Sequence, residues 1–147
     1  MSQADLRAQV TLARETIHNP DEPRHFMRIK PVKGRVRVLL DGQVLAESAQ
    51  ALRVLEAGRD LYDPVVYFPA ADVRVTLSPA AKRTVCPLKG QATYLDLAAE
   101  RGRAAVPEIA WSYRETFDFA AALKGRVAFD AARVTVEEQP PAAAAAS

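Results

Sequence analysis

Residues that form disulfides or bind metals are scarce in this sequence. It has one cysteine, Cys86, and two histidines, His18 and His25. A single thiol cannot form a disulfide within the chain, and neither a Cys-x-x-Cys nor a His-Glu-x-x-His spacing is present to hold a metal ion. We therefore expect no metal site and a fold stabilised by packing, while any other cofactor stays unknown.

Charge of one sign and long apolar runs are also lacking. The 20 basic and 18 acidic residues give a net charge of +2, which is too weak a field to indicate a nucleic acid or an anionic membrane as the partner. No stretch approaches the roughly 20 apolar residues of a membrane-spanning helix, and the basic start and apolar run of a signal peptide are absent. We therefore expect a cytoplasmic protein.

The N-terminal residues, 1–24, are predicted to form a helical appendage to a single domain. Apolar side chains recur at intervals of four, three and four residues, as on one face of an amphipathic helix: Leu6, Val10, Ala13 and Ile17. Pro20 and Pro23 would end this helix. Because so short a helix is marginal alone, its apolar face is expected to pack on the body or on a second subunit, which would give a homodimer.

Residues 25–138 show the alternation that is typical of β-strands. The strongest signal lies on both sides of Asp41-Gly42, a pair that favours a tight hairpin turn. Residues 48–57 fit a helix or a strand, and a strand is preferred because the β-rich residues 64–69 need a partner. Further strands are expected at residues 92–98, 103–113, 125–129 and 133–137.

The intervening segments complete a mainly β fold of two sheets or a partly closed barrel, with the N-terminal helix added. Pro69 to Val73 is predicted to be a turn or a short helical stretch, and Phe117 to Leu123 a helical turn. Ser78 to Gly90 has few periodic apolar positions and is predicted to be a loop. Residues 139–147 have little to bury and are expected to be disordered.

Cys86-Pro87-Leu88-Lys89-Gly90 is the most informative string for chemistry. An ammonium group three positions after a thiol could favour the thiolate and make Cys86 a nucleophile or a redox centre. The alternative is preferred, in which Cys86 is a small buried group and Lys89 is solvated, because no histidine lies nearby in the sequence. The string also lacks the glycine-rich pattern of a phosphate-binding loop.

Large side chains with polar tips and two acids could line a pocket. Trp111 and Tyr113 share one face of their expected strand while Ser112 faces away, so these two aromatic residues are predicted either both to pack in the core, which is preferred, or both to line a site. Glu56 and Asp72 stand beside apolar segments, where desolvation could raise their pKa and suit them to proton transfer. Alternatively Glu56 pairs with an arginine, and Asp72, with preference, bonds nearby backbone amides in a turn.

These strings together resemble the DUF427 family of bacteria and fungi, over about residues 35–136. The specific parts are Cys-Pro-x-Lys-Gly-x-Ala-x-Tyr, from Cys86 to Tyr94, and Ala-Trp-Ser-Tyr at residues 110–113. The resemblance implies a compact β domain of the two-sheet, tent-like type whose signature residues converge on one cleft. Carried over position by position, the candidate ligand-binding residues are Glu56, Tyr67, Asp72, Cys86, Lys89, Tyr94, Trp111 and Tyr113.

The family also carries a nucleotidyltransferase-type label, which this chain does not support. Such catalysis needs a Gly-Ser loop and closely spaced metal-binding carboxylates, and neither is present in the sequence. We expect instead a small ligand, with Lys89 holding an anionic group and the aromatic side chains stacking on it, in a cleft lined by Tyr67, Asp72, Cys86, Lys89 and Trp111. The alternative is a protein interaction module without catalysis, and whether the domain is an enzyme stays open.

Overall fold

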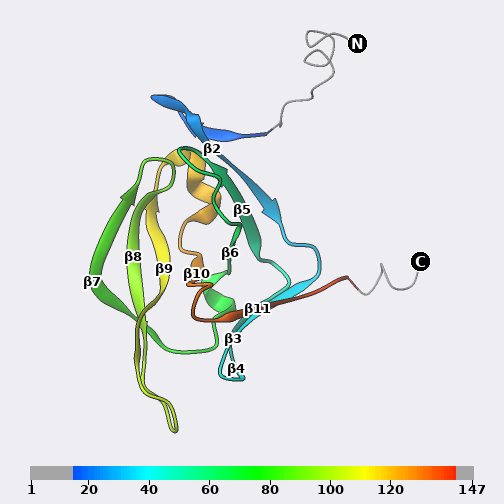
Figure 1. The fold of residues 1–147 in the computed structure, drawn as a ribbon, viewed down its shortest axis with the longest axis vertical. Helices are drawn as coiled ribbons and strands as arrows, with labels where there is room; N and C mark the ends of the chain where they lie inside the picture. Colours follow the sequence, from blue (N-terminus) through cyan, green and yellow to red (C-terminus); the bar gives the residue numbers. More distant parts are fainter. Residues whose placement is uncertain (1–14, 142–147) are drawn as a thin grey trace.

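Eleven strands in three antiparallel sheets account for most of residues 15–141, the part of the chain that the computed structural model describes (Figure 1). The mainly β class is therefore confirmed. The number of sheets differs from the two expected, and none of the three closes into a barrel. No helix in the described residues is long and apolar enough to cross a membrane.

The first sheet has the strand order β1-β2-β5-β6. The bounds are Ile17–Asn19 for β1, Glu22–Pro31 for β2, Leu52–Ala57 for β5 and Val65–Tyr67 for β6. The strand preferred within residues 48–57 is thus confirmed by β5, which pairs with β2 on one side and β6 on the other.

The N-terminal helix is not found in the part of the expected segment that the structure describes. Ile17 lies in β1 opposite Met27 of β2, and Pro20 lies in the turn that joins these strands. Ile17 packs against a buried cluster as a strand residue, so its apolar character reflects the sheet and not a helix face. The first sheet begins before residue 25, residues 1–14 of the expected helix lie outside the described residues, and the homodimer stays a prediction.

The second sheet has the order β10-β9-β8-β7. The bounds are Leu77–Cys86 for β7, Gly90–Leu97 for β8, Val106–Thr116 for β9 and Val127–Phe129 for β10. The loop expected over residues 78–90 is wrong, because β7 occupies most of it. As an edge strand, β7 exposes most of its side chains and lacks apolar periodicity, and an edge tolerates Pro79 beside an irregularity in the pairing.

The third sheet has the order β11-β3-β4. The bounds are Arg35–Leu40 for β3, Gln43–Ser48 for β4 and Thr135–Gln139 for β11. The hairpin turn is confirmed, since Asp41 and Gly42 have φ angles of 48° and 82°, the two positive values that this turn requires. Gln139, where the disordered tail was expected to begin, pairs with Arg35, and residues 142–147 lie outside the described part.

Two short 3₁₀ helices and two buried clusters join the sheets. The helices η1 (Ala70–Asp72) and η2 (Asp118–Leu123) confirm the helical turns expected there. The first cluster joins the second and third sheets through residues such as Val38, Leu45, Leu97 and Ile109. The second cluster joins the first and second sheets and η2, through Met27, Val54, Leu88, Tyr113 and Leu123.

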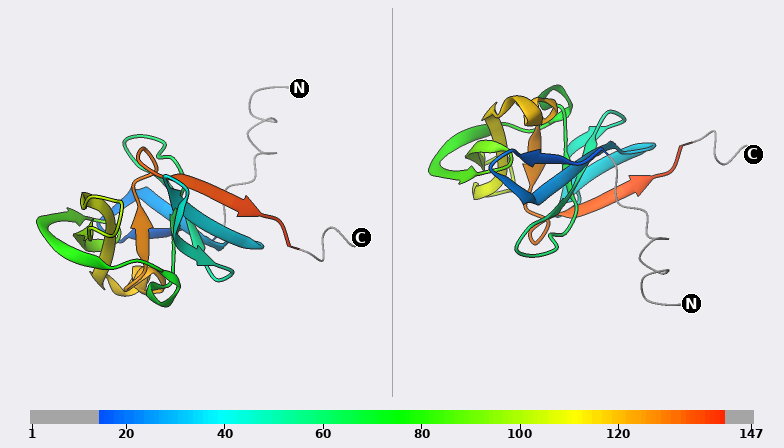
Figure 2. Two further views of the ribbon diagram at one scale, coloured as in Figure 1. Left: turned by 90° about the horizontal axis from the view of Figure 1, so that it is seen from below. Right: turned by 90° about the horizontal axis from the view of Figure 1, so that it is seen from above.

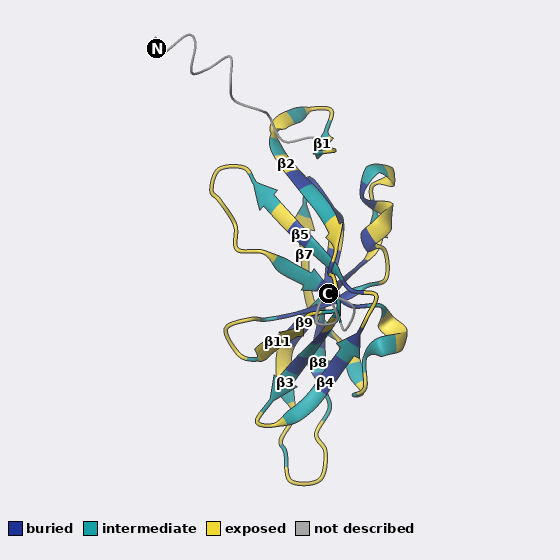
Figure 3. Cartoon of the chain, turned by 90° about the vertical axis from the view of Figure 1, so that its right-hand side faces the viewer, coloured by how far each residue is buried: buried dark blue, intermediate teal, exposed yellow. Residues whose placement is uncertain are grey.

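The strand β10 stands where the sheets meet. Its Val127 forms a bridge with Phe68, just after β6, while the strand itself pairs with β9. Figure 2 shows β10 between the strands of the second sheet on one side and those of the third sheet on the other. Figure 3 shows buried positions along the strands that face one another and exposed positions at the loops and outer edges. The candidate site lies where the first and second sheets face each other.

Candidate functional site

The turn between β7 and β8 points into the molecule. It spans residues 87–89, and the amide of Lys89 donates to the carbonyl of Cys86 at 3.3 Å. Leu88 is fully buried and Lys89 is 5% exposed, whereas most hairpin turns lie in solvent. The side-chain amide of Asn19 donates to the carbonyl of Pro87 at 2.9 Å and ties this turn to β1.

Gly90 fixes the end of the same turn. Its φ angle is +133°, and a side chain there would collide with the backbone carbonyl oxygen of Glu115 in β9. Only glycine fits such a conformation and such a close approach. The glycine in the Cys86–Gly90 string is therefore explained by the backbone, and it holds Lys89 at a fixed place.

Lys89 meets Glu56 of β5 across the space between the two sheets. The Nζ atom of Lys89 donates to Oε1 of Glu56, and Nε2 of His25, from β2, lies 2.6 Å from Oε2 of the same carboxylate. The exposed fractions of the three side chains are only 6% for Lys89, 15% for Glu56 and 18% for His25. A lysine from the turn before β8 and a histidine from β2 thus share one largely buried carboxylate, an arrangement that is costly to break once formed.

Glu56 does not have the raised pKa that the sequence suggested. Burial does act to raise the pKa of this carboxyl group, but the hydrogen bonds from Lys89 and His25 outweigh it, and the pKa falls below its ordinary value. Glu56 is therefore ionised at neutral pH and is a poor proton donor. Its partners are a lysine and a histidine, and not the arginine that the sequence offered as the alternative.

The Glu56–Lys89 pair lies at an aromatic cavity of about 210 Å³, which we call the inner cavity. It is lined by Val54, Glu56, Tyr62, Asp63, Val65, Tyr67, Lys89, Tyr94, Trp111 and Tyr113. Trp111 Nε1 donates to the Tyr67 hydroxyl at 3.3 Å, and the rings of Trp111 and Tyr94 lie 6.2 Å apart at 38°. The cavity therefore combines stacking surfaces with one buried ion pair.

Trp111 and Tyr113 line the same cavity, and Ser112 lines a different one with Leu95 and Val127. This confirms that Trp111 and Tyr113 share a face. Burial raises the pKa of both Tyr67 and Tyr113 well above the usual range. Both phenols are therefore neutral hydroxyl groups at physiological pH and serve the cavity as hydrogen-bonding tips.

A family model described as a domain of unknown function (DUF427) matches residues 28–140. The chain belongs to the DUF427 family. A comparison with curated proteins gave no match. The matched part of this DUF427 domain holds Glu56, the Cys86–Gly90 string and the strand with Trp111, but it begins after His25.

Six of the eight candidate residues of the DUF427 domain line the inner cavity, and the other two do not. Cys86 is half-buried beside it, with Sγ 3.8 Å from the Lys89 Nζ atom. The interpretation of Lys89 as a solvated side chain is wrong, since it is buried and paired. No group of three His, Cys, Asp or Glu residues in the described part of the domain is arranged to hold a metal ion.

Asp72 lies apart from the inner cavity. Its carboxylate accepts a hydrogen bond of 2.6 Å from Ser48 Oγ, and that hydroxyl in turn accepts the amide of Gln50 at 2.8 Å. Ala70, the first residue of η1, and Val73, which follows η1, line the cavity on the Ser112 side of β9. Asp72 therefore connects η1 to the end of β4, and its carboxylate bonds a side chain where a backbone amide was expected.

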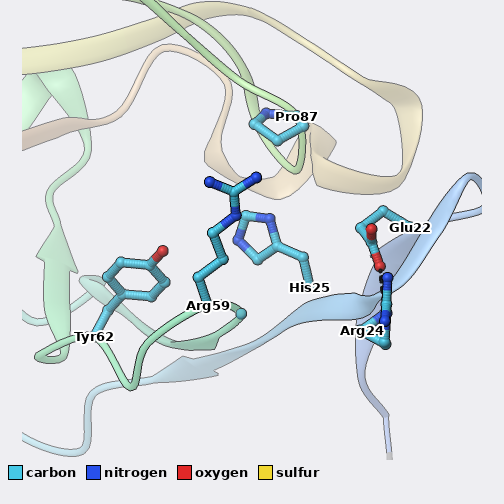
Figure 4. A pocket seen from close by; sticks show the side chains of 7 residues that line it. Glu22, Arg24, His25, Arg59, Tyr62 and Pro87 are labelled. Carbon is cyan, nitrogen blue, oxygen red and sulfur yellow. Dashed lines mark hydrogen bonds and ion pairs between the residues drawn. The ribbon is translucent and has the colours of Figure 1, made fainter.

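A second cavity, which we call the outer cavity, is not indicated by any pattern in the sequence. It has a volume of about 680 Å³ and is lined by Glu22, Arg24, His25, Gly58, Arg59, Tyr62 and Pro87 (Figure 4). Tyr62 lines both cavities, and the His25 ring lies 6.3 Å from the Tyr62 ring. Only a prediction that paired β2 with β5, with Met27 opposite Glu56, would have brought the His25 side chain within reach of Glu56.

Proposed function

We propose that the inner cavity binds a small molecule through a planar polar group. The observation that carries this proposal is the hydrogen-bonding capacity left on the buried Glu56–Lys89 pair. An ammonium group has three donors. Among the described residues, Lys89 directs one donor to Glu56 and has only the weak acceptor Cys86 Sγ for another. Each carboxylate oxygen of Glu56 has one partner among the described residues and can accept a further bond.

The Lys89 ammonium group can donate and the Glu56 carboxylate beside it can accept. Together they match a ligand edge that carries an acceptor next to a donor. Amides, lactams and many heteroaromatic rings carry such an edge. The rings of Tyr94 and Trp111 supply faces on which a planar group can stack. The cavity volume of about 210 Å³ lies below the roughly 300–1,000 Å³ of cavities that hold drug-sized ligands. A single ring or a small fused pair is the size that it supports.

The charge balance favours a neutral group at Lys89 over the anionic group that the sequence suggested. The charge of Lys89 is already balanced by Glu56, and Asp63 adds a second carboxylate to the lining. An anion placed beside Lys89 would be close to the Glu56 carboxylate and in the same cavity as Asp63. The resulting repulsion is screened less in a cavity than in bulk water. We therefore propose that Lys89 and Glu56 bind an uncharged polar edge.

The single tryptophan makes the proposal directly testable, because Trp111 lines the cavity. The full chain would be titrated with 2-pyridone, which has a lactam N–H beside its carbonyl, and with N-methyl-2-pyridone, which lacks the donor. We expect 2-pyridone to change Trp111 fluorescence and to raise the unfolding temperature, and the methylated compound to bind more weakly. Lys89→Met should abolish this preference.

The matched control is Lys124→Met, because Lys124 is exposed and lines none of the described cavities. Unchanged binding in Lys124→Met, with lost preference in Lys89→Met, supports the proposal. Equal responses of the two variants, or no response of Trp111 to either compound, would count against it and would leave the interaction module as the remaining prediction.

A further inference from the structure

The outer cavity carries an arginine that has no anionic partner in the described part of the chain. Arg59 lines this cavity, and its side chain takes part in none of the ion pairs or hydrogen bonds of the described residues. The neighbouring carboxylate, Asp60, accepts the amide of Leu61 at 2.8 Å. The guanidinium group is therefore available to a ligand, and Figure 4 shows it extending into the cavity together with His25.

The remaining charges of the outer cavity leave it positive. Glu22 is the only carboxylate in the lining, and it accepts hydrogen bonds of 3.2 Å from both the backbone amide and the Nε atom of Arg24. Arg24 and Glu22 thus balance each other, and Arg59 contributes an uncompensated positive charge.

The segment that presents Arg59 is held by hydrogen bonds. The amide of Gly58 donates to the carbonyl of Asp60 at 2.9 Å, and the amide of Tyr62 donates to the carbonyl of Glu56 at 3.2 Å. The His25 ring lies against Gly58, where an added Cβ would be only 2.9 Å from its Cδ2 atom. This close approach places His25 beside the residue that precedes Arg59, and the two residues line the same cavity.

We infer that the outer cavity is a phosphate subsite for the ligand of the inner cavity, so that the ligand is a planar polar group bearing a phosphate. This inference rests on the proposed function. The two cavities adjoin at Tyr62, and His25 of the outer cavity is hydrogen-bonded to Glu56 of the inner one. With Nε2 of His25 donating to the ionised Glu56, the Nδ1 atom is an acceptor. A phosphate can donate to this atom through a P–OH group while its charged oxygens accept hydrogen bonds from the Arg59 fork.

The test compares phenyl phosphate with phenol by calorimetry and Trp111 fluorescence, on the full chain and on Arg59→Gln. The control variant is Arg101→Gln, because Arg101 is also exposed but lines neither cavity. We expect phenyl phosphate to bind at least about tenfold more tightly than phenol, as a charge-assisted hydrogen bond implies. Arg59→Gln should remove this advantage, and Arg101→Gln should keep it. Arg59 is exposed, so its replacement leaves folding intact.

The outcomes separate this inference from the proposed function. If phenyl phosphate and phenol both change Trp111 fluorescence but bind equally well, or if Arg59→Gln behaves like Arg101→Gln, the phosphate subsite is overturned and the inner-cavity proposal stands. If phenyl phosphate binds in an Arg59-dependent way without any change at Trp111, the single bipartite ligand is overturned. Benzoate that binds as tightly as phenyl phosphate would overturn the assignment to phosphate, and binding of none of these compounds would overturn the inference.

Discussion

The Nε2 atom of His25 lies 2.6 Å from Oε2 of Glu56, while Oε1 of the same carboxylate accepts a hydrogen bond from Lys89. His25 comes from β2, Glu56 from β5 and Lys89 from the turn that precedes β8. One carboxylate therefore joins the first sheet to the buried turn of the second. Its ionised state affects both the stability of the domain and the geometry of the inner cavity.

Replacing Glu56 should lower the stability of the domain more than replacing its partner Lys89. Glu56→Gln leaves the buried ammonium group without its anion and should lower the free energy of unfolding by about 3 kcal/mol or more. Lys89→Met should cost less, because Glu56 keeps His25 as a partner. Urea unfolding of both single variants and the double variant measures the coupling, and the double variant should be close to Lys89→Met.

A surface pair offers the control for that measurement. Arg37 Nε lies 2.7 Å from Glu137 Oε2, but the two side chains are 35% and 46% exposed. Glu137→Gln should therefore change stability by less than about 1 kcal/mol. Equal losses in Glu56→Gln and Glu137→Gln would show that the buried carboxylate is not needed by Lys89.

The lowered pKa of Glu56 predicts a dependence of stability on acid pH. The folded state holds the pKa of Glu56 below its ordinary value of 4.5, to which it returns on unfolding. The resulting stability is complete above the unfolded pKa and is lost as the pH falls through the lower folded pKa. Thermal unfolding between neutral pH and about pH 3 should show the difference between the wild type and Glu56→Gln shrinking with acid. A constant difference would contradict the prediction.

Gly90 should tolerate alanine much less than Gly102, which also has a positive φ angle but stands in open space. Gly90→Ala brings a Cβ against the Glu115 carbonyl, whereas Gly102, with a φ angle of +79°, has no atom within 4 Å of an added Cβ. Gly102→Ala should cost about 1 kcal/mol from backbone strain alone, and Gly90→Ala should cost more than about 3 kcal/mol. Similar losses of unfolding free energy in the two variants would mean that β8 shifts away from β9 without penalty.

The buried phenols of Tyr67 and Tyr113 should not ionise in an alkaline titration of the folded chain. The sequence has four tyrosines, and burial raises the pKa of Tyr67 and Tyr113 well above the usual range. Ultraviolet absorbance should therefore show no phenolate from these two until the chain unfolds. Tyr67→Phe should leave the titration curve below the unfolding pH unchanged, and a loss of amplitude there would show that Tyr67 is accessible to solvent.

Local sequence signals predicted the elements that depend on local geometry. Asp41-Gly42 gave the hairpin because this turn needs two positive φ angles, and the alternation at residues 111–113 placed Trp111 and Tyr113 on one face of β9. The edge strand β7 lacks such a signal, because most of its side chains are exposed and show no apolar periodicity. For that reason its residues resemble a loop in the sequence.

The candidate site could be predicted in part only, because its charges are paired over long range. The spacing of Cys86 and Lys89 is local, and it correctly placed the thiol near the ammonium group. The partners of Glu56 lie 31 and 33 residues away and depend on which strands pair and how the turn at residues 87–89 inserts. The expectation of a raised pKa failed for the same reason, since burial was visible in the sequence and the two hydrogen bonds were not.

The bond from the Asn19 side chain to the Pro87 carbonyl gives the residues before the family match a role within it. Through this hydrogen bond they hold the turn at residues 87–89 against the first sheet. A fragment trimmed to residues 28–140 would lose both the Asn19–Pro87 hydrogen bond and His25. Such a fragment would keep the strands of the second and third sheets. Lys89 would keep its bond to Glu56, but the turn that carries Lys89 would no longer be bonded to β1.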